Sequence, residues 1–91
     1  MVAFSKKWKK DELDKSTGKQ KMLILHNDSV NSFDYVIKTL CEVCDHDTIQ
    51  AEQCAFLTHF KGQCEIAVGE VADLVPLKNK LLNKNLIVSI H

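Results

Sequence analysis

Three side chains that accept hydrogen bonds are the most informative chemical feature of this chain. Asn27 and Asp28 end an apolar run in LILHND (residues 23–28), and His59 lies in THFKG (residues 58–62). An amide oxygen, a carboxylate and a neutral imidazole nitrogen together suit an ammonium group, which carries three donors. If the fold brings the two motifs together, we expect a binding site for a small cationic group.

Each motif also has an ordinary structural interpretation when it is taken alone. Asn27 and Asp28 are turn formers that lead into a helix, and His59 fits a surface position near a helix C-terminus. The joint spacing of the two motifs favours the binding site. For His26 we leave open whether it supports the site or has only a structural role.

Catalysis by a cysteine and a histidine is one alternative. Cys54 and His59 are five residues apart on one predicted helix, so their side chains point about 140° apart and cannot form a dyad. Cys41 or Cys64 would reach His59 only in a fold that the sequence does not specify. We therefore predict that the chain is not an enzyme.

Metal binding is another alternative. Cys41 and Cys44 form a C-x-x-C pair with His46 close by, but the pair falls on a helical pattern and no second pair follows. A closed zinc site needs four ligands, so core or half-buried thiols are the favoured interpretation. A small metal- or protein-binding module using Cys41, Cys44 and His46 stays as the alternative function. We predict no cofactor and no metal.

Length and charge favour a small binding module. A chain of 91 residues forms one domain and buries roughly 60–65% of its unfolded surface, which disfavours a deep enzyme cleft. Lys plus Arg and Asp plus Glu number 12 each, so no net field favours nucleic acid or anionic lipid. No apolar run approaches the roughly 18 residues of a membrane span. Without a secretory signal, we expect reduced cysteines and a cytoplasmic location.

The first 19 residues differ in composition from the rest. They are charged and rich in lysine, whereas the chain after Met22 is apolar and periodic. Lysines around Trp8 could form an electrostatic arm for nucleic acid, but three acidic residues follow at once. We therefore predict a flexible charged extension over residues 1–19 and a folded domain over residues 20–91.

The apolar pattern of that domain predicts alternating strands and helices. Turn formers, caps and glycines set the expected limits: a strand over 20–25, a helix capped by Asn31 or Ser32 up to residue 44, a helix capped by Asp47 or Thr48 up to Gly62, a strand over 64–68, a connector over 69–73, a helix carrying Leu74 to Leu82 and a strand over 86–91. Because an internal proline costs about 3 kcal/mol, Pro76 should lie in the first turn of a helix that begins no earlier than about Asp73.

The resulting β-α-α-β-α-β order predicts an α+β fold. Its natural packing is a three-stranded sheet with three helices on one face. The loop after the first strand and the end of the second helix then lie beside the sheet edge, where the two motifs can converge.

Three segments in this order resemble the ClpS family, the adaptors of the AAA+ Clp proteases. They are LHND after an apolar strand, a His-aromatic-Lys-Gly end of the second helix, and EVADL at residues 70–74. The resemblance runs from about Lys21 to His91. The region between Gly69 and the last strand is shorter than in well-known members, which indicates a compact subgroup.

The resemblance implies recognition of destabilising N-terminal residues and delivery of those substrates to a Clp ATPase. By this likeness Asn27, Asp28 and His59 bind the substrate α-amine. A second aspartate is common where Ser29 stands, so the local negative charge is lower here.

The resemblance also implies a side-chain pocket and a docking surface. Several pocket positions depart from the family's common threonine, methionine or valine, which leaves the accepted side chains open. The pocket residues are Asn31, Phe33, Val36, Ala55, Thr58 and Ile87. Glu70 is the expected ATPase contact, and the N-terminal extension is expected to engage the ATPase during delivery. The implied partners are a ClpA- or ClpC-like ATPase and N-degron substrates. When it is not bound to them, this protein is expected to be a monomer.

Overall fold

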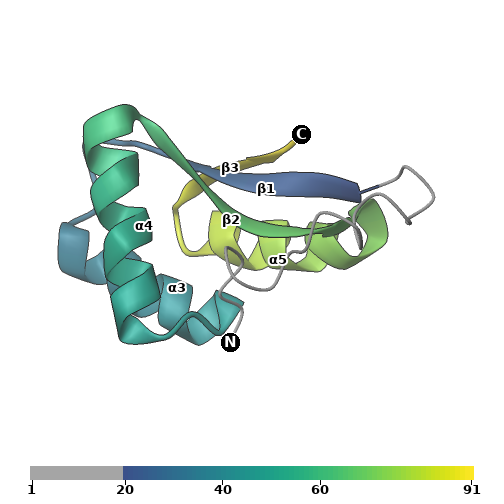
Figure 1. Cartoon of the computed structure of the whole chain (residues 1–91), viewed down its shortest axis with the longest axis horizontal. Helices are drawn as coiled ribbons and strands as arrows, with labels where there is room; N and C mark the ends of the chain where they lie inside the picture. The colour runs from purple at the N-terminus through teal and green to yellow at the C-terminus, as the bar shows by residue number, and fades with distance from the viewer. Residues whose placement is uncertain (1–19) are drawn as a thin grey trace.

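The computed structural model describes residues 20–91, and these residues have the predicted β-α-α-β-α-β order (Figure 1). The predicted N-terminal extension over residues 1–19 lies outside the described part. The elements are β1 (Gln20–His26), α3 (Phe33–Cys44), α4 (Thr48–Lys61), β2 (Gln63–Glu70), α5 (Val71–Asn83) and β3 (Ile87–Ile90). Within residues 20–91, none of the helices is long and apolar enough to cross a membrane.

Local side-chain signals set the ends of α3 and α4. The Ser32 side chain caps α3 by accepting a hydrogen bond from the backbone N–H of Tyr35, and Asp47 caps α4 in the same way through Gln50. Gly62 ends α4 with a φ of 95°, in the left-handed region that favours glycine. Of the two cap candidates predicted for each helix, Ser32 and Asp47 are the caps, and the predicted Gly62 ends α4.

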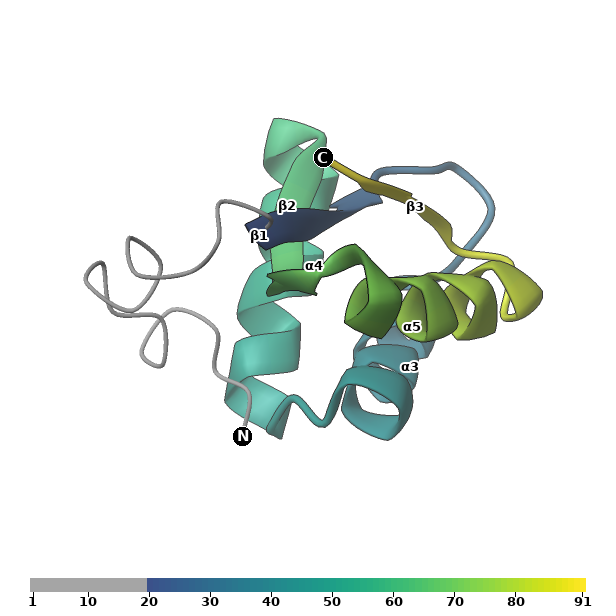
Figure 2. The same cartoon turned by 90° about the vertical axis from the view of Figure 1, so that its right-hand side faces the viewer.

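The sheet is antiparallel with the strand order β2-β1-β3, so β1 lies at its centre. Residues of all three helices pack in one cluster with strand residues, and α3 and α5 lie below the strands in both views (Figures 1 and 2), which confirms the predicted fold class. Strand side chains alternate between faces, and Leu23 and Leu25 pack in the core with the helices. Met22 lies on the opposite alternation and is 38% exposed.

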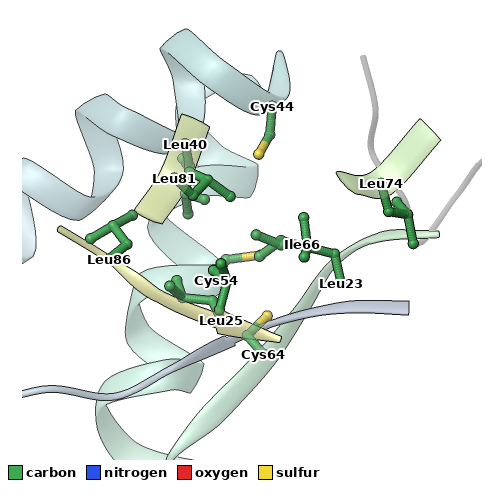
Figure 3. Packing of buried hydrophobic residues seen from close by; sticks show 12 residues of the cluster. Leu23, Leu25, Leu40, Cys44, Cys54, Cys64, Ile66, Leu74, Leu81 and Leu86 are labelled. Carbon is green, nitrogen blue, oxygen red and sulfur yellow. The ribbon is translucent and has the colours of Figure 1, made fainter. Parts of the chain in front are cut away.

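The core fills the space between this sheet face and the three helices. Leu40 of α3, Cys54 of α4, Leu81 of α5 and Leu25 of the central strand belong to one buried cluster (Figure 3). The cluster contains mainly leucine with small thiol side chains. Its other buried members are Leu23, Cys44, Ala51, Cys64, Ile66, Leu74, Leu86 and Val88.

The predicted connector over residues 69–73 is wrong. Strand β2 continues to Glu70 and α5 begins at Val71, which places Pro76 inside the helix. The missing N–H of Pro76 removes one helical hydrogen bond early in α5. Leu74 is only 2% exposed. Its burial favours a helix that begins at Val71, although proline alone would favour a later start with Pro76 in the first turn.

Candidate functional site

Strand pairing brings the LILHND and THFKG motifs together. Because β2 follows α4 directly and pairs with β1, His26 lies opposite Gln63. The backbone N–H of Asn27 donates to the carbonyl oxygen of Gly62 at 2.9 Å, and the N–H of Gly62 donates to that of Thr58 at 3.0 Å. The end of β1 is thus fastened to the C-terminus of α4.

A cavity of about 360 Å³ lies between these two ends and α3. The predicted amine-binding residues all line it, and so do five of the six predicted side-chain pocket residues. The complete lining is Leu25, His26, Asn27, Asp28, Ser29, Asn31, Phe33, Val36, Ala55, Thr58 and His59.

Two predicted residues lie outside this lining. Ile87 pairs with His26 across β1 and β3 and is 50% exposed. Glu70 is the exposed residue that precedes α5. Conversely, Leu25, His26 and Ser29 line the cavity although they were not predicted as site residues. The sequence left the role of His26 open and marked Ser29 only as a departure from the family pattern, and Leu25 had no signal beyond its place in the motif.

The Asp28 carboxylate is held in place by its own loop. Its Oδ1 accepts from the backbone N–H groups of Val30 and Asn31, both at 2.8 Å, and its Oδ2 accepts from Asn31 Nδ2 at 3.0 Å. Burial raises the pKa of this carboxyl, but the hydrogen bonds from Asn31 and Val30 outweigh it and lower the pKa overall. The cavity therefore carries a fixed negative charge at neutral pH.

Asn31 has a structural task that the sequence did not reveal. Besides bonding Asp28, its Nδ2 donates to the carbonyl oxygen of Asn85 at 2.8 Å. Asn85 lies between α5 and β3 with a φ of 69°, and nearby the Tyr35 hydroxyl donates to the carbonyl oxygen of Lys84 at 2.8 Å. These bonds join the β1–α3 loop and the first turn of α3 to the α5–β3 turn, and the Asn31 bonds orient the Asp28 carboxylate.

Two exposed rings line the cavity, one from α3 and one from α4. Phe33 and His59 meet edge to face, with ring centroids 6.5 Å apart and an interplanar angle of 87°. His59 also meets Phe60 edge to face at 4.7 Å. Since Phe33 is 41% exposed and His59 is exposed as well, the ring pair borders the opening to solvent.

The remaining cavity wall is mainly apolar. Ala55 and Thr58 of α4 are almost fully buried, and Val36 of α3 is half-buried. The Thr58 hydroxyl donates to the Cys54 carbonyl oxygen at 2.7 Å, so it is satisfied within the helix. The cavity thus joins a carboxylate and an amide at one end to an apolar wall, which suits a ligand that is cationic at one point and apolar beside it.

The comparison with models of protein families shows to which family this chain belongs. Residues 16–86 match the model described as ATP-dependent Clp protease adaptor protein ClpS. The chain belongs to the ClpS family. Among curated proteins, none matches the sequence.

A solved structure shows the same ClpS fold. The match is to "The structure of Agrobacterium tumefaciens ClpS2 bound to L-phenylalaninamide", with a TM-score of 0.69 and 16% sequence identity. It covers 80% of this chain and 95% of the Agrobacterium tumefaciens chain. At this identity the likeness concerns the fold, and the family assignment rests on the ClpS family model.

The alternative metal site at Cys41, Cys44 and His46 is not formed in this ClpS domain. His46 is buried and its Nε2 donates to the Ile66 carbonyl oxygen at 3.0 Å. Burial raises the pKa of the Cys44 thiol to about 12. Across residues 20–91, no group of three or more His, Cys, Asp or Glu side chains is placed to hold a metal ion.

The cysteines also lie away from the ClpS cavity. All four are free thiols, and none is among the lining residues. The Cys54 thiol hydrogen-bonds Cys64, which raises the pKa of Cys54 and lowers that of Cys64. Cys54 and Cys64 belong to the hydrophobic core, so their interaction serves packing beneath the site.

Proposed function

We propose that this ClpS protein is an N-end rule adaptor. It binds the free α-amine and the bulky apolar side chain of a substrate's N-terminal residue, and it delivers the substrate to a Clp AAA+ ATPase. The observation that carries this proposal is the ionised Asp28 carboxylate, held by hydrogen bonds in the lining of a cavity that also has apolar lining residues. The protein works as a binding adaptor without catalysis of its own.

The amine half of the proposal rests on Asn27, Asp28 and His59. An α-ammonium group has three donors, and these side chains offer an amide oxygen, a carboxylate and an imidazole nitrogen along one cavity. The Oδ2 of Asp28 accepts a hydrogen bond from the Asn31 amide at 3.0 Å, and a carboxylate oxygen has a second lone pair that can accept a hydrogen from the ligand. A charge-assisted hydrogen bond contributes about 1.5–3 kcal/mol net.

The side-chain half rests on Val36, Ala55 and Thr58, with Phe33 at the opening. An aromatic side chain of about 200 Å² contributes about 5 kcal/mol on burial before entropy costs. The small Ala55 leaves room at the inner wall, whereas Phe33 narrows the entrance. The ligand named for the Agrobacterium tumefaciens protein, L-phenylalaninamide, combines the same two features, a free amine and an aromatic side chain.

We place the surface that contacts the ATPase at the start of α5. Glu70 is exposed and precedes the helix without making a side-chain capping bond, so its carboxylate is presented to solvent away from the cavity. The partner class is a ClpA- or ClpC-like ATPase. Its identity, the part played by residues 1–19, the monomeric state and the cytoplasmic location stay predictions from the sequence.

Fluorescence anisotropy with labelled peptides that differ only at the first residue tests the side-chain half. Peptides that begin with Phe, Leu or Trp are expected to bind, and a peptide that begins with Asp is expected not to, because its carboxylate would meet an apolar wall and lie near Asp28. Equal affinity for the Asp and Phe peptides would contradict the proposal.

A further inference from the structure

A second polar cluster lies on the sheet face opposite the helices. His26 Nε2 lies 2.6 Å from the Ser89 hydroxyl oxygen, and His91 Nε2 lies 2.6 Å from the same oxygen. The two imidazole rings meet edge to face, with centroids 6.3 Å apart and an interplanar angle of 67°. His26 also lines the amine cavity, whereas Ser89 and His91 do not, so the cluster adjoins the proposed adaptor site through His26 and extends from it onto β3.

Strand register explains why these side chains converge. Ser89 lies opposite Ile24 on β1, and His91 exchanges two backbone hydrogen bonds of 2.8 Å with Met22. His26 and His91 therefore start from positions roughly 13 Å apart along the sheet, four residues at about 3.3 Å each. Both rings lean toward Ser89 between them.

The Nε2 atoms of both imidazoles point to the same atom, the Ser89 hydroxyl oxygen, and we call its position the focal point. A hydroxyl has one hydrogen, so the Ser89 oxygen donates to one Nε2 and accepts from the other, which requires different tautomers of the two neutral rings. Zn²⁺ binds imidazole nitrogen at about 2.0–2.1 Å. An ion at the position of the Ser89 oxygen would therefore require each ring to move by roughly 0.5 Å, with the serine side chain rotated away.

We propose that His26 and His91 form a two-histidine binding site for a divalent transition-metal ion such as Zn²⁺. Imidazole nitrogen selects zinc, nickel or copper over Mg²⁺ and Ca²⁺, which prefer oxygen ligands. No third His, Cys, Asp or Glu in residues 20–91 completes the set, so water occupies the other coordination positions. His91 is exposed and His26 is half-buried, which leaves the focal point open to an ion from solvent.

Calorimetric titration of the full chain with Zn²⁺ at pH 7.5, with a phosphine reductant present, tests this site. We expect one ion per chain, and we expect His91→Asn to weaken binding by at least about tenfold, since loss of a second-shell partner alone costs about 10–100-fold.

Two matched variants separate this site from other zinc ligands. Asp73→Asn removes an exposed carboxylate on α5, outside both sites, and Cys41→Ser removes the half-buried thiol. Both should bind Zn²⁺ as the unchanged chain does. In a long-range ¹H–¹⁵N spectrum, the Nε2 signals of His26 and His91 should shift on Zn²⁺ addition. The proposal is overturned by absence of Zn²⁺ binding, by unchanged binding in His91→Asn, or by loss of binding in either control.

Discussion

The backbone N–H of Asn27 and the carbonyl oxygen of Gly62 are joined by a hydrogen bond of 2.9 Å. This bond connects the end of β1 to the end of α4, and so it connects the two motifs of the adaptor site. It depends on the left-handed conformation of Gly62, whose φ is 95°. A single glycine thus sets where the chain leaves α4 and how β2 begins its pairing with β1.

Replacement of Gly62 by alanine should destabilise the domain by about 1 kcal/mol, because an L side chain disfavours the left-handed region. No atom lies within 4 Å of the added methyl group, so the cost is conformational rather than steric. Urea denaturation measures it.

The matched control is Gly69→Ala. Its φ is not in the left-handed region, and its methyl group would meet Leu74 and Asp73 at 3.8 and 3.9 Å, which are ordinary contacts. We expect a change within about 0.5 kcal/mol. If both alanine variants had the same stability, the conformational argument for Gly62 would be wrong.

Asn31→Ala should weaken peptide binding by about fivefold, the equivalent of about 1 kcal/mol. The variant removes the amide that holds Asp28 Oδ2 and ties this loop to Asn85. Anisotropy with a Phe-first peptide gives the affinity. Asn79→Ala, an exposed position on α5, is the control, and equal affinity of the two variants would show that the Asn31 bonds do not support the site.

Because His46 is buried, we predict that the folded domain loses stability on acidification. Burial lowers the pKa of His46 below its ordinary 6.5, against the opposing effects of the Ile66 hydrogen bond and the Asp47 charge. The unfolded chain therefore binds the proton more readily than the folded chain. The free energy of unfolding should be highest above about pH 6.5 and should fall as the pH drops toward the lower folded-state pKa.

Urea denaturation at pH 7.5, 6.5 and 5.5 tests this dependence. A His46→Gln variant, although less stable overall, should lose less stability between pH 7.5 and 5.5 than the unchanged chain does. An identical pH slope in both proteins would assign the effect to other groups.

Glu70→Lys should weaken association with the Clp ATPase while peptide affinity stays unchanged, because the exposed carboxylate lies outside the cavity lining. Glu52→Lys makes the same charge change on the exposed surface of α4 and serves as the control. Co-sedimentation with the ATPase and peptide anisotropy should be measured on the same samples. Full ATPase binding by Glu70→Lys would remove this residue from the docking surface.

The sequence predicts features that depend on neighbours in the chain and misses those that depend on distant partners. Ser32, Asp47 and Gly62 mark helix ends through local bonds and local conformation, so their positions were predictable. The start of α5 was not, because burial of Leu74 outweighs the local preference of Pro76. Likewise, the contact of Asn31 with Asn85 spans 54 residues and leaves no local pattern.

The candidate cavity was likewise predictable only in part. Two separated motifs carried both the polar acceptors and the family resemblance, and strand pairing brings those motifs to one cavity. The partners that orient the acceptors were not visible, since they lie in the α5–β3 turn. Ile87, named by resemblance, lies on the exposed sheet face because strand register rather than residue type sets its direction.

The central claim is that the cavity recognises a free α-amine. Anisotropy should compare one Phe-first peptide with its N-acetylated form, against the unchanged chain and against Asp28→Asn. We predict that the free peptide binds the unchanged chain, that acetylation abolishes this binding because it removes the charge and two donors, and that Asp28→Asn weakens it severely. Equal affinity for the free and acetylated peptides would contradict the account.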